Sequence, residues 1–370
     1  MPFASNFGFF KDAPDGDIRF RDSLTLLMKT DNTGASNNDQ VKLPIRGGPY
    51  LIDWGDGTIE TQSQTSTTPS NGGGITHTYS TAGQYTIKIK DTASIPTYDP
   101  SDATTWQMFQ FYGLATQDPQ KLLKILRWGT PGFQFTDRMF LGCTNLSILS
   151  TVDTPPTTAT TYRNFFRMFE DCTSLTNGGT ISTWDTSNVL SISQMFKGAN
   201  QFNESLNGWT SFSATLTDMS QVFMNATAFN GNISSWDTST ITTFNEMFSG
   251  ATAFTSNIGS WNISAGTSFR LMFFNATSFN YNIGSWTFKS GAGVGDAFGM
   301  FEGASAFNQN IGSWYTGQLQ YNMGNMFKDA TIFNQDLTGW CVDVLSSQPS
   351  NFSQNSALTS ANLPVWGTCP

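Results

Sequence analysis

Apolar positions recur with a long period over most of this chain. Seven tryptophans are spaced by 25 to 28 residues, namely Trp184, Trp209, Trp236, Trp261, Trp286, Trp314 and Trp340. Within one unit the apolar residues fall every three or four positions, as in Ile241, Phe244, Met247, Phe248, Ala251, Phe254, Ile258 and Trp261. Neither a helical nor a strand period persists. The repeat predicts a solenoid, in which each coil buries its apolar face only by stacking on its neighbours.

Equivalent positions of successive units carry the same residue type, so stacked coils should form ladders of identical side chains. The coils are expected to run from about Trp128 to Trp340. Gly and Asn after each Met-Phe pair suit tight corners, and so do Asp185, Asp237 and Asn262 after Trp. Cys143 and Cys172 occupy a slot that is Ala in the other units. We expect two buried free thiols there rather than a disulfide or a reactive site, because free Cys packs as a small hydrophobe.

A different pattern precedes the repeats. Short strand-like runs cover residues 24–30, 40–45, 50–54 and 84–90, separated by Gly, Asn and Thr, and they predict a β-sandwich. Residues 121–127 read as the first strand of a cap or coil. The expected domains are an anchor segment at 1–20, a sandwich at 21–95, a connector and N-terminal cap at 96–127, repeats at 128–340 and a C-terminal cap at 341–370.

Composition and charge argue against several classes of binding partner. Charged residues make up only 12% of the chain, aromatic residues 14%, and the formal net charge is -9. This charge opposes nucleic acid, which is bound mainly through Lys and Arg. No apolar stretch reaches the roughly 20 residues of a membrane span, and the start lacks the basic and apolar regions of a signal peptide. The four cysteines form no CxxC pattern, so neither zinc nor another cofactor is expected.

Three motifs in order carry a resemblance to a known family. Asp-Trp-Gly-Asp-Gly-Thr at 53–58, Thr-His-Thr-Tyr at 76–79 and Ala-Gly-Gln-Tyr-Thr-Ile at 82–87 resemble the signature of PKD-like domains. The resemblance implies an immunoglobulin-like sandwich of the kind found in surface proteins and beside carbohydrate-active enzymes.

The repeat unit, Met-Phe-x-x-Ala-x-x-Phe-Asn-x-x-Ile-x-x-Trp, resembles the BspA-like leucine-rich repeats of bacterial and mycoplasma surface proteins. The expected fold class is therefore mainly β, with a PKD-like immunoglobulin-like sandwich and a leucine-rich-repeat-type solenoid of about eight coils. Because the last coil of a solenoid needs a cap, we expect a disulfide between Cys341 and Cys369 to tie down the C-terminal tail.

Few residues point to catalysis. His77 is the single histidine, and we expect it to contact the Trp-Gly-Asp-Gly turn. Asp53 and Asp56 are candidates for calcium, although capping of the turn is favoured over calcium. Asp185 and Asp237 are the conceivable acid and base pair of a polysaccharide-cleaving enzyme, but both occupy the same repeat slot and read first as turn residues. We expect no enzyme.

The expected function is a surface-displayed adhesion protein, extracellular or on a particle surface, whose repeats contact a protein or glycan. Aromatic residues outside the ladders are the candidate contacts, although each could equally fill its own loop: Phe212, Tyr281, Phe288, Tyr315 and Tyr321. The alternatives are a structural accessory or decoration protein of a virion or surface filament and, less favoured, a carbohydrate-active enzyme.

The first residues predict attachment to a larger assembly. Phe3, Phe7, Phe9 and Phe10 crowd into ten residues, whereas disordered tails are poor in aromatic residues. We expect this segment to dock on a partner or neighbouring subunit. Packing against the chain's own sandwich is an equal alternative.

Overall fold

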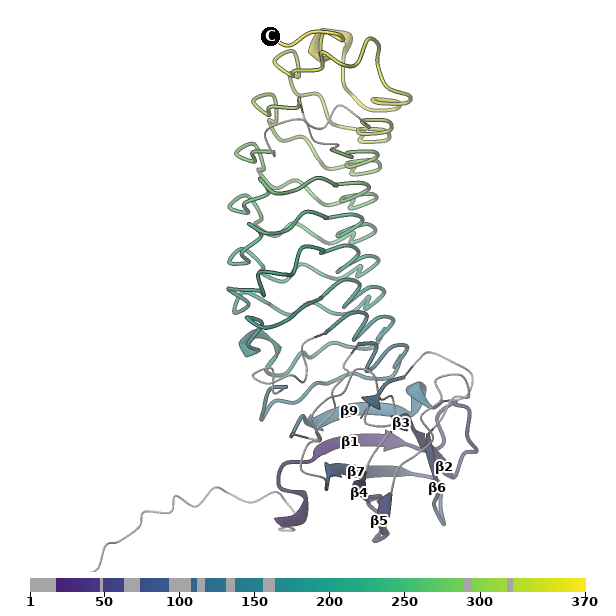
Figure 1. Cartoon of the computed structure of the whole chain (residues 1–370). Coiled ribbons are helices and arrows are strands. Elements are labelled where there is room, and N and C mark those ends of the chain that lie inside the picture. Colours follow the sequence, from purple (N-terminus) through teal and green to yellow (C-terminus); the bar gives the residue numbers. More distant parts are fainter. Residues whose placement is uncertain are drawn as a thin grey trace, which may run out of the picture.

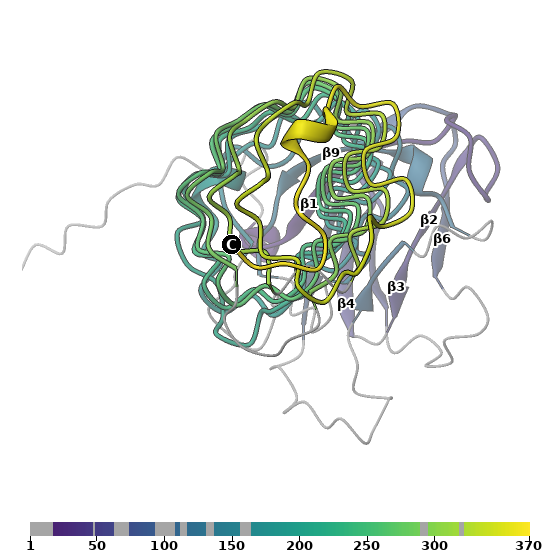
Figure 2. The ribbon, with the colours of Figure 1, turned by 90° about the horizontal axis from the view of Figure 1, so that it is seen from above.

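A computed structural model describes residues 18–46, 49–62, 74–92, 108–111, 117–130, 137–155, 164–288, 295–317 and 322–370. Strands gather at one end of the molecule, and a column of stacked coils leads from them to the C-terminus (Figure 1). Seen along the column, successive coils superpose closely (Figure 2). Phe3, Phe7, Phe9 and Phe10, the aromatic residues of the predicted anchor, lie outside the described residues.

The strands form one antiparallel sheet of five and two sheets of two. The large sheet has the order β5-β4-β7-β1-β9, with β5 Ile59–Gln62, β4 Tyr50–Asp53, β7 Gln84–Asp91, β1 Leu24–Lys29 and β9 Leu122–Arg127. The small sheets pair β2 Gln40–Leu43 with β6 Ile75–Thr78, and β3 Ile45–Arg46 with β8 Met108–Phe109. Burial alternates along β1, so one face of the strand packs into the core. The predicted strand runs are confirmed as local elements.

Strand β9 joins the sheet to the repeats. On one side it pairs with β1, and on the other Lys124 forms a parallel bridge with Ile148 of the first repeat. Ile125 N donates to Ile148 O at 3.0 Å. The repeat therefore covers a sheet edge that would otherwise expose unpaired backbone groups. The short 3-10 helix η4 (Pro119–Lys121) leads directly into β9.

Stacked aromatic rings fill the column. The first Phe of the motif Met-Phe-x-x-Ala-x-x-Phe-Asn forms a ladder from Phe140 to Phe327. The ring centroids of successive coils lie 5.5 to 5.8 Å apart. A second Phe ladder runs from Phe202 to Phe333. Indole N–H groups donate to carbonyl groups of the preceding coil, as Trp261 Nε1 does to Ile233 O at 3.1 Å. The predicted ladders are confirmed.

Backbone hydrogen bonds repeat at the Met-Phe corner of every coil. In one unit, Glu246 N, Phe248 N and Gly250 N donate to Arg270 O, Met272 O and Phe274 O of the next, at 2.9, 2.9 and 2.7 Å. Two residues of this corner, Glu246 and Gly250, have positive φ values of 53° and 71°. Each left-handed residue breaks the extended backbone that a strand requires.

The predicted fold class is therefore wrong. Among the described residues every strand lies between Leu24 and Arg127, and the sheets are small. The repeats consist of turns, isolated bridges and single-turn 3-10 helices such as η5 (Ile181–Thr183) and η6 (Ser360–Asn362). The chain is largely irregular, rather than a mainly β chain with an immunoglobulin-like sandwich and a leucine-rich-repeat-type solenoid. The predicted domain boundaries stay predictions.

Truncation inside the ladder tests this packing. Phe248 is fully buried between Phe223 and Phe273, so Phe248→Ala should lower the free energy of unfolding by about 3 to 5 kcal/mol. Denaturant titration measures the loss. Tyr315→Ala is the matched control, because this ring is 59% exposed and its removal should change stability by about 0.5 kcal/mol or less. A loss below about 1 kcal/mol for Phe248→Ala would contradict the packing.

Candidate binding surface

The turn between β4 and β5 uses both of its carboxylates within the protein. Asp53 Oδ1 accepts from Gly55 N at 3.0 Å, and its Oδ2 lies 3.5 Å from Lys88 Nζ. Asp56 Oδ1 accepts from Thr58 N at 2.9 Å, and its Oδ2 lies 2.8 Å from His77 Nε2. These contacts cap the turn, as the sequence favoured over calcium. The described residues contain no cluster of three or more His, Cys, Asp or Glu side chains suited to a metal ion.

His77 serves the same turn. Its ring stacks on Trp54 with centroids 4.6 Å apart and meets Tyr79 edge-on. Burial alone would raise the pKa of Asp56, but hydrogen bonds from His77 and Thr58 outweigh it and place that pKa below its usual value. The predicted contact between His77 and the turn is confirmed.

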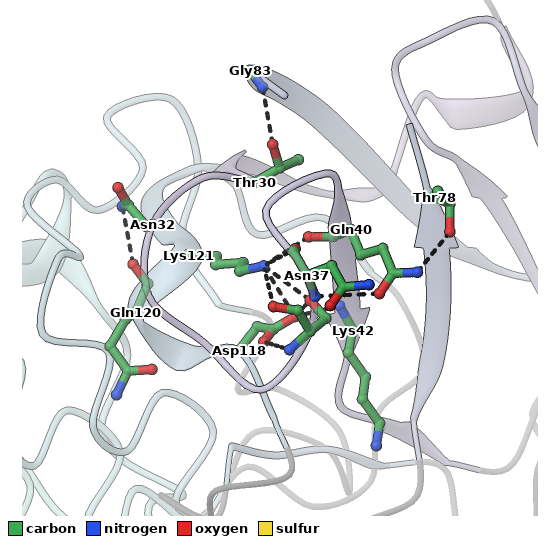
Figure 3. A network of polar contacts seen from close by, with 11 residues as sticks. Thr30, Asn32, Asn37, Gln40, Lys42, Thr78, Gly83, Asp118, Gln120 and Lys121 are labelled. Carbon is green, nitrogen blue, oxygen red and sulfur yellow. Dashed lines mark hydrogen bonds and ion pairs between the residues drawn. The ribbon is translucent and has the colours of Figure 1, made fainter. Parts of the chain in front are cut away.

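A buried ion pair lies at the centre of a network of polar contacts in the strand region (Figure 3). The side chains of Asp118 and Lys121 are fully buried, with Lys121 Nζ 4.0 Å from Asp118 Oδ2. Lys121 Nζ also donates to Asn37 O at 2.8 Å and Gln40 O at 2.9 Å, while Asp118 Oδ2 accepts from Lys42 N at 2.7 Å. Burial lowers the pKa of Lys121, against the opposing charge of Asp118. The network fastens the loop before β2 to the start of β9, which is a structural role.

The acidic residues of the repeats are also engaged locally. Asp185 and Asp237 accept hydrogen bonds from Ser187 N and Ser239 N at 2.9 and 3.0 Å, and hydrogen bonds from these serines lower the pKa of both carboxyl groups. They are Asx-turn residues, as predicted. Glu302 pairs with Lys328 at 2.7 Å. Each of these carboxylates is thus engaged in a turn or an ion pair.

The cysteines divide as the sequence suggested. Cys143 and Cys172 are free and fully buried, and burial raises the pKa of both thiols, which keeps them protonated and unreactive. Cys341 and Cys369 are joined by a disulfide in the C-terminal tail.

The five candidate contact rings lie in different environments. Phe212 is half-buried edge-on to Trp236, and Phe288 is buried between Phe269 and Trp314, which removes it from the accessible surface. Tyr281 is half-buried, and Tyr315 is 59% exposed. Tyr321 lies outside the described residues. Among the four described rings, Tyr315 is therefore exposed, Phe212 and Tyr281 are half-buried, and Phe288 is buried.

Tyr281 lines a shallow groove of about 520 Å³ that crosses three successive coils. We call it the Tyr281 groove, defined by its lining residues Asn257, Gly259, Ser260, Tyr281, Asn282, Gly284, Ser285, Gln309, Asn310 and Ser313. They come from one segment of the unit, between the second Phe and the Trp. Because Phe, Ile and Trp of that segment point inward, Asn, Gly and Ser are left at the surface. The repeated Asn-Ile-Gly-Ser-Trp at 257–261, 282–286 and 310–314 was the sequence signal for this groove.

Comparison with known proteins identifies one similarity. The family described as "Mycoplasma protein of unknown function, DUF285" matches residues 107–215, 213–299 and 291–366, which together span more than half of the chain. No curated protein and no solved structure gives a match. No helix among the described residues is long and apolar enough to cross a membrane.

Removing one partner of the buried ion pair should destabilise the protein strongly. Lys121→Met leaves the Asp118 carboxylate buried without its cation, and the free energy of unfolding should fall by about 3 to 5 kcal/mol. Lys29→Met is the control, because the Lys29 side chain is 37% exposed in its pair with Asp31 and should contribute about 1 kcal/mol or less. Equal stability of the two variants in a denaturant titration would contradict the structural role.

Thiol counting tests the cysteine assignment. In the unreduced native chain we expect no reactive thiol, because two cysteines are buried and two are bonded. Denaturant without reductant should expose two thiols, and reductant should then raise the number to four. The bond closes a loop of 28 residues, for which chain entropy gives about 3 to 4 kcal/mol of stability. Four thiols in the unreduced, denatured chain would reject the disulfide.

Proposed function

The chain belongs to the DUF285 family, and we propose that it is a non-enzymatic binding protein, displayed on a cell or particle surface, whose repeat column presents itself to a protein or glycan. One observation carries this proposal. The column keeps its large side chains in internal ladders and exposes a long, weakly charged surface of Ser, Thr, Asn and Gly. Extended repeat surfaces of this kind commonly bind ligands.

Two further features support the proposal. The resemblance of the unit to BspA-like repeats connects it with surface proteins. The candidate acids, His77 and the free thiols are all engaged in packing, turns or ion pairs, so the proposal assigns no chemistry to them. The net charge of -9 disfavours nucleic acid as the partner.

A binding screen of the full chain tests this function. The purified protein should bind saturably to at least one member of a panel of immobilised glycans, extracellular matrix proteins and intact cells, and it should release no product from polysaccharides. Circular dichroism before and after the screen shows that the protein stays folded. If the folded chain binds no member and instead assembles into regular copies, a structural accessory role replaces binding. Turnover of a polysaccharide would show an enzyme.

A further inference from the structure

We propose that the Tyr281 groove is a binding site for a neutral carbohydrate, with Tyr281 as its aromatic contact. This inference rests on the proposed binding function and gives it a site and a ligand class. Two glycines that line the groove, Gly259 and Gly284, lie where neighbouring coils approach each other closely. A Cβ added at Gly259 would lie 2.7 Å from Asn282 O, and one added at Gly284 would lie 2.6 Å from Asn310 O. Glycine is therefore required at both positions by the close approach of the coils, and these two lining residues place no side chain in the groove.

Tyr281 is the one aromatic ring among the described residues that line the groove. The same hypothetical Cβ at Gly259 would lie 3.3 Å from Tyr281 Cε1, so the ring rests against the preceding coil. The corresponding position of the neighbouring units is Ser256 and Gln309. An aromatic ring held at the side of a shallow polar groove offers a flat apolar surface, on which the C–H face of a sugar can pack.

The amides of the groove are oriented by their own backbone. Asn257 Oδ1, Asn282 Oδ1 and Asn310 Oδ1 accept from the N–H of Gly259, Gly284 and Gly312 at 3.0, 2.9 and 3.0 Å. Because each oxygen is taken by a backbone donor, the assignment of oxygen and nitrogen is fixed. The three NH₂ groups have no hydrogen-bond partner among the described residues, and all three asparagines are exposed.

These donors stand one per coil. The second Phe ladder beneath them has centroid spacings of 5.8 Å between Phe254 and Phe279 and 5.7 Å between Phe279 and Phe307. A ligand that lies along the column therefore meets the amides in succession, with the Ser260, Ser285 and Ser313 hydroxyls alongside. Successive hydroxyl groups of an oligosaccharide match such a row, because each can accept from an amide.

The lack of charged side chains among the described residues of the groove favours a neutral glycan over other classes of ligand. The described residues that line the groove include no Lys, Arg, Asp or Glu. An anionic sugar or a phosphate would lack a cation there. A peptide would be expected to use an unpaired strand edge or an apolar pocket, and this lining offers hydroxyl, amide and glycine groups instead. The chemistry favours a ligand with many hydroxyl groups and no charge.

Two variants of the full chain test the site. The probes are immobilised neutral oligosaccharides of glucose, galactose, mannose and N-acetylhexosamine, with sialylated and sulfated glycans as the anionic comparison. Tyr281→Ala should weaken binding of the best neutral probe about tenfold or more, a loss of the size found at interface anchor residues. Asn282→Asp should also weaken it about tenfold, because the carboxylate lacks the donor. Aspartate keeps the turn, since Asp336 Oδ1 caps Thr338 N at 2.9 Å in the corresponding position.

Controls separate the site from the fold and from the wider function. Ile332→Ala removes an exposed apolar side chain that does not line the groove and should leave binding unchanged. Thermal unfolding should be the same in all four proteins. Loss of neutral-glycan binding in both groove variants supports the site. If neutral glycans bind equally to every variant, or if only anionic glycans, proteins or cells are bound, the groove proposal is overturned while the binding function stands. If the folded chain binds nothing, both proposals fail.

Discussion

The column depends on aromatic rings of one coil lying flat against those of the next. A single coil buries its apolar side chains only against its neighbours, so its stability depends on them. Stacked rings of the Phe140-to-Phe327 ladder lie 5.5 to 5.8 Å apart, and each such pair adds about 0.5 to 1.5 kcal/mol beyond its buried area. The two ends of the ladder need covers. Phe109 of β8, whose ring centroid lies 6.0 Å from that of Phe140, supplies one, and the edge-on ring of Phe352 on Phe327 supplies the other.

The sequence was sufficient to predict the contents of this column but not its backbone. Phe, Trp and Ala recur in fixed slots, so the ladders followed from the period alone, and β1 and β7 followed from short runs of strand-forming residues. The prediction of the fold class was wrong because of the backbone at the Met-Phe corners. Glu246 and Leu271 have φ values of 53°, and neither residue type signals a left-handed backbone. That geometry is imposed by stacking against adjacent coils, which a local reading of the chain does not contain.

The sequence also predicted some residues of the candidate site and missed others. Tyr281 was named from the sequence because it stands outside the ladders, yet Phe288 met the same criterion and is buried against Trp314. The difference arises from how a neighbouring segment folds over each ring, which spacing does not encode. The amides of Asn257, Asn282 and Asn310 were not singled out at all. Their role depends on which amide atom the glycine N–H occupies, and this requires the three-dimensional turn.

One position of the repeat unit varies from coil to coil, whereas the Phe and Trp residues on either side of it do not. Between the second Phe and the Trp, one position holds Glu204, Gly231, Ser256, Tyr281, Gln309 and Gln335 in six successive coils; Gly231 is buried and the other five are half-buried. The flanking Phe and Trp stay the same and carry the stacking energy. Where the position carries a side chain, its identity differs from coil to coil while the ladder residues beneath it stay the same. At Gly231 the chain has no such freedom, because a Cβ there would lie 2.0 Å from Glu204 O. Residue identity at this position is therefore limited by how closely the neighbouring coil approaches, and the aromatic ladders set that approach.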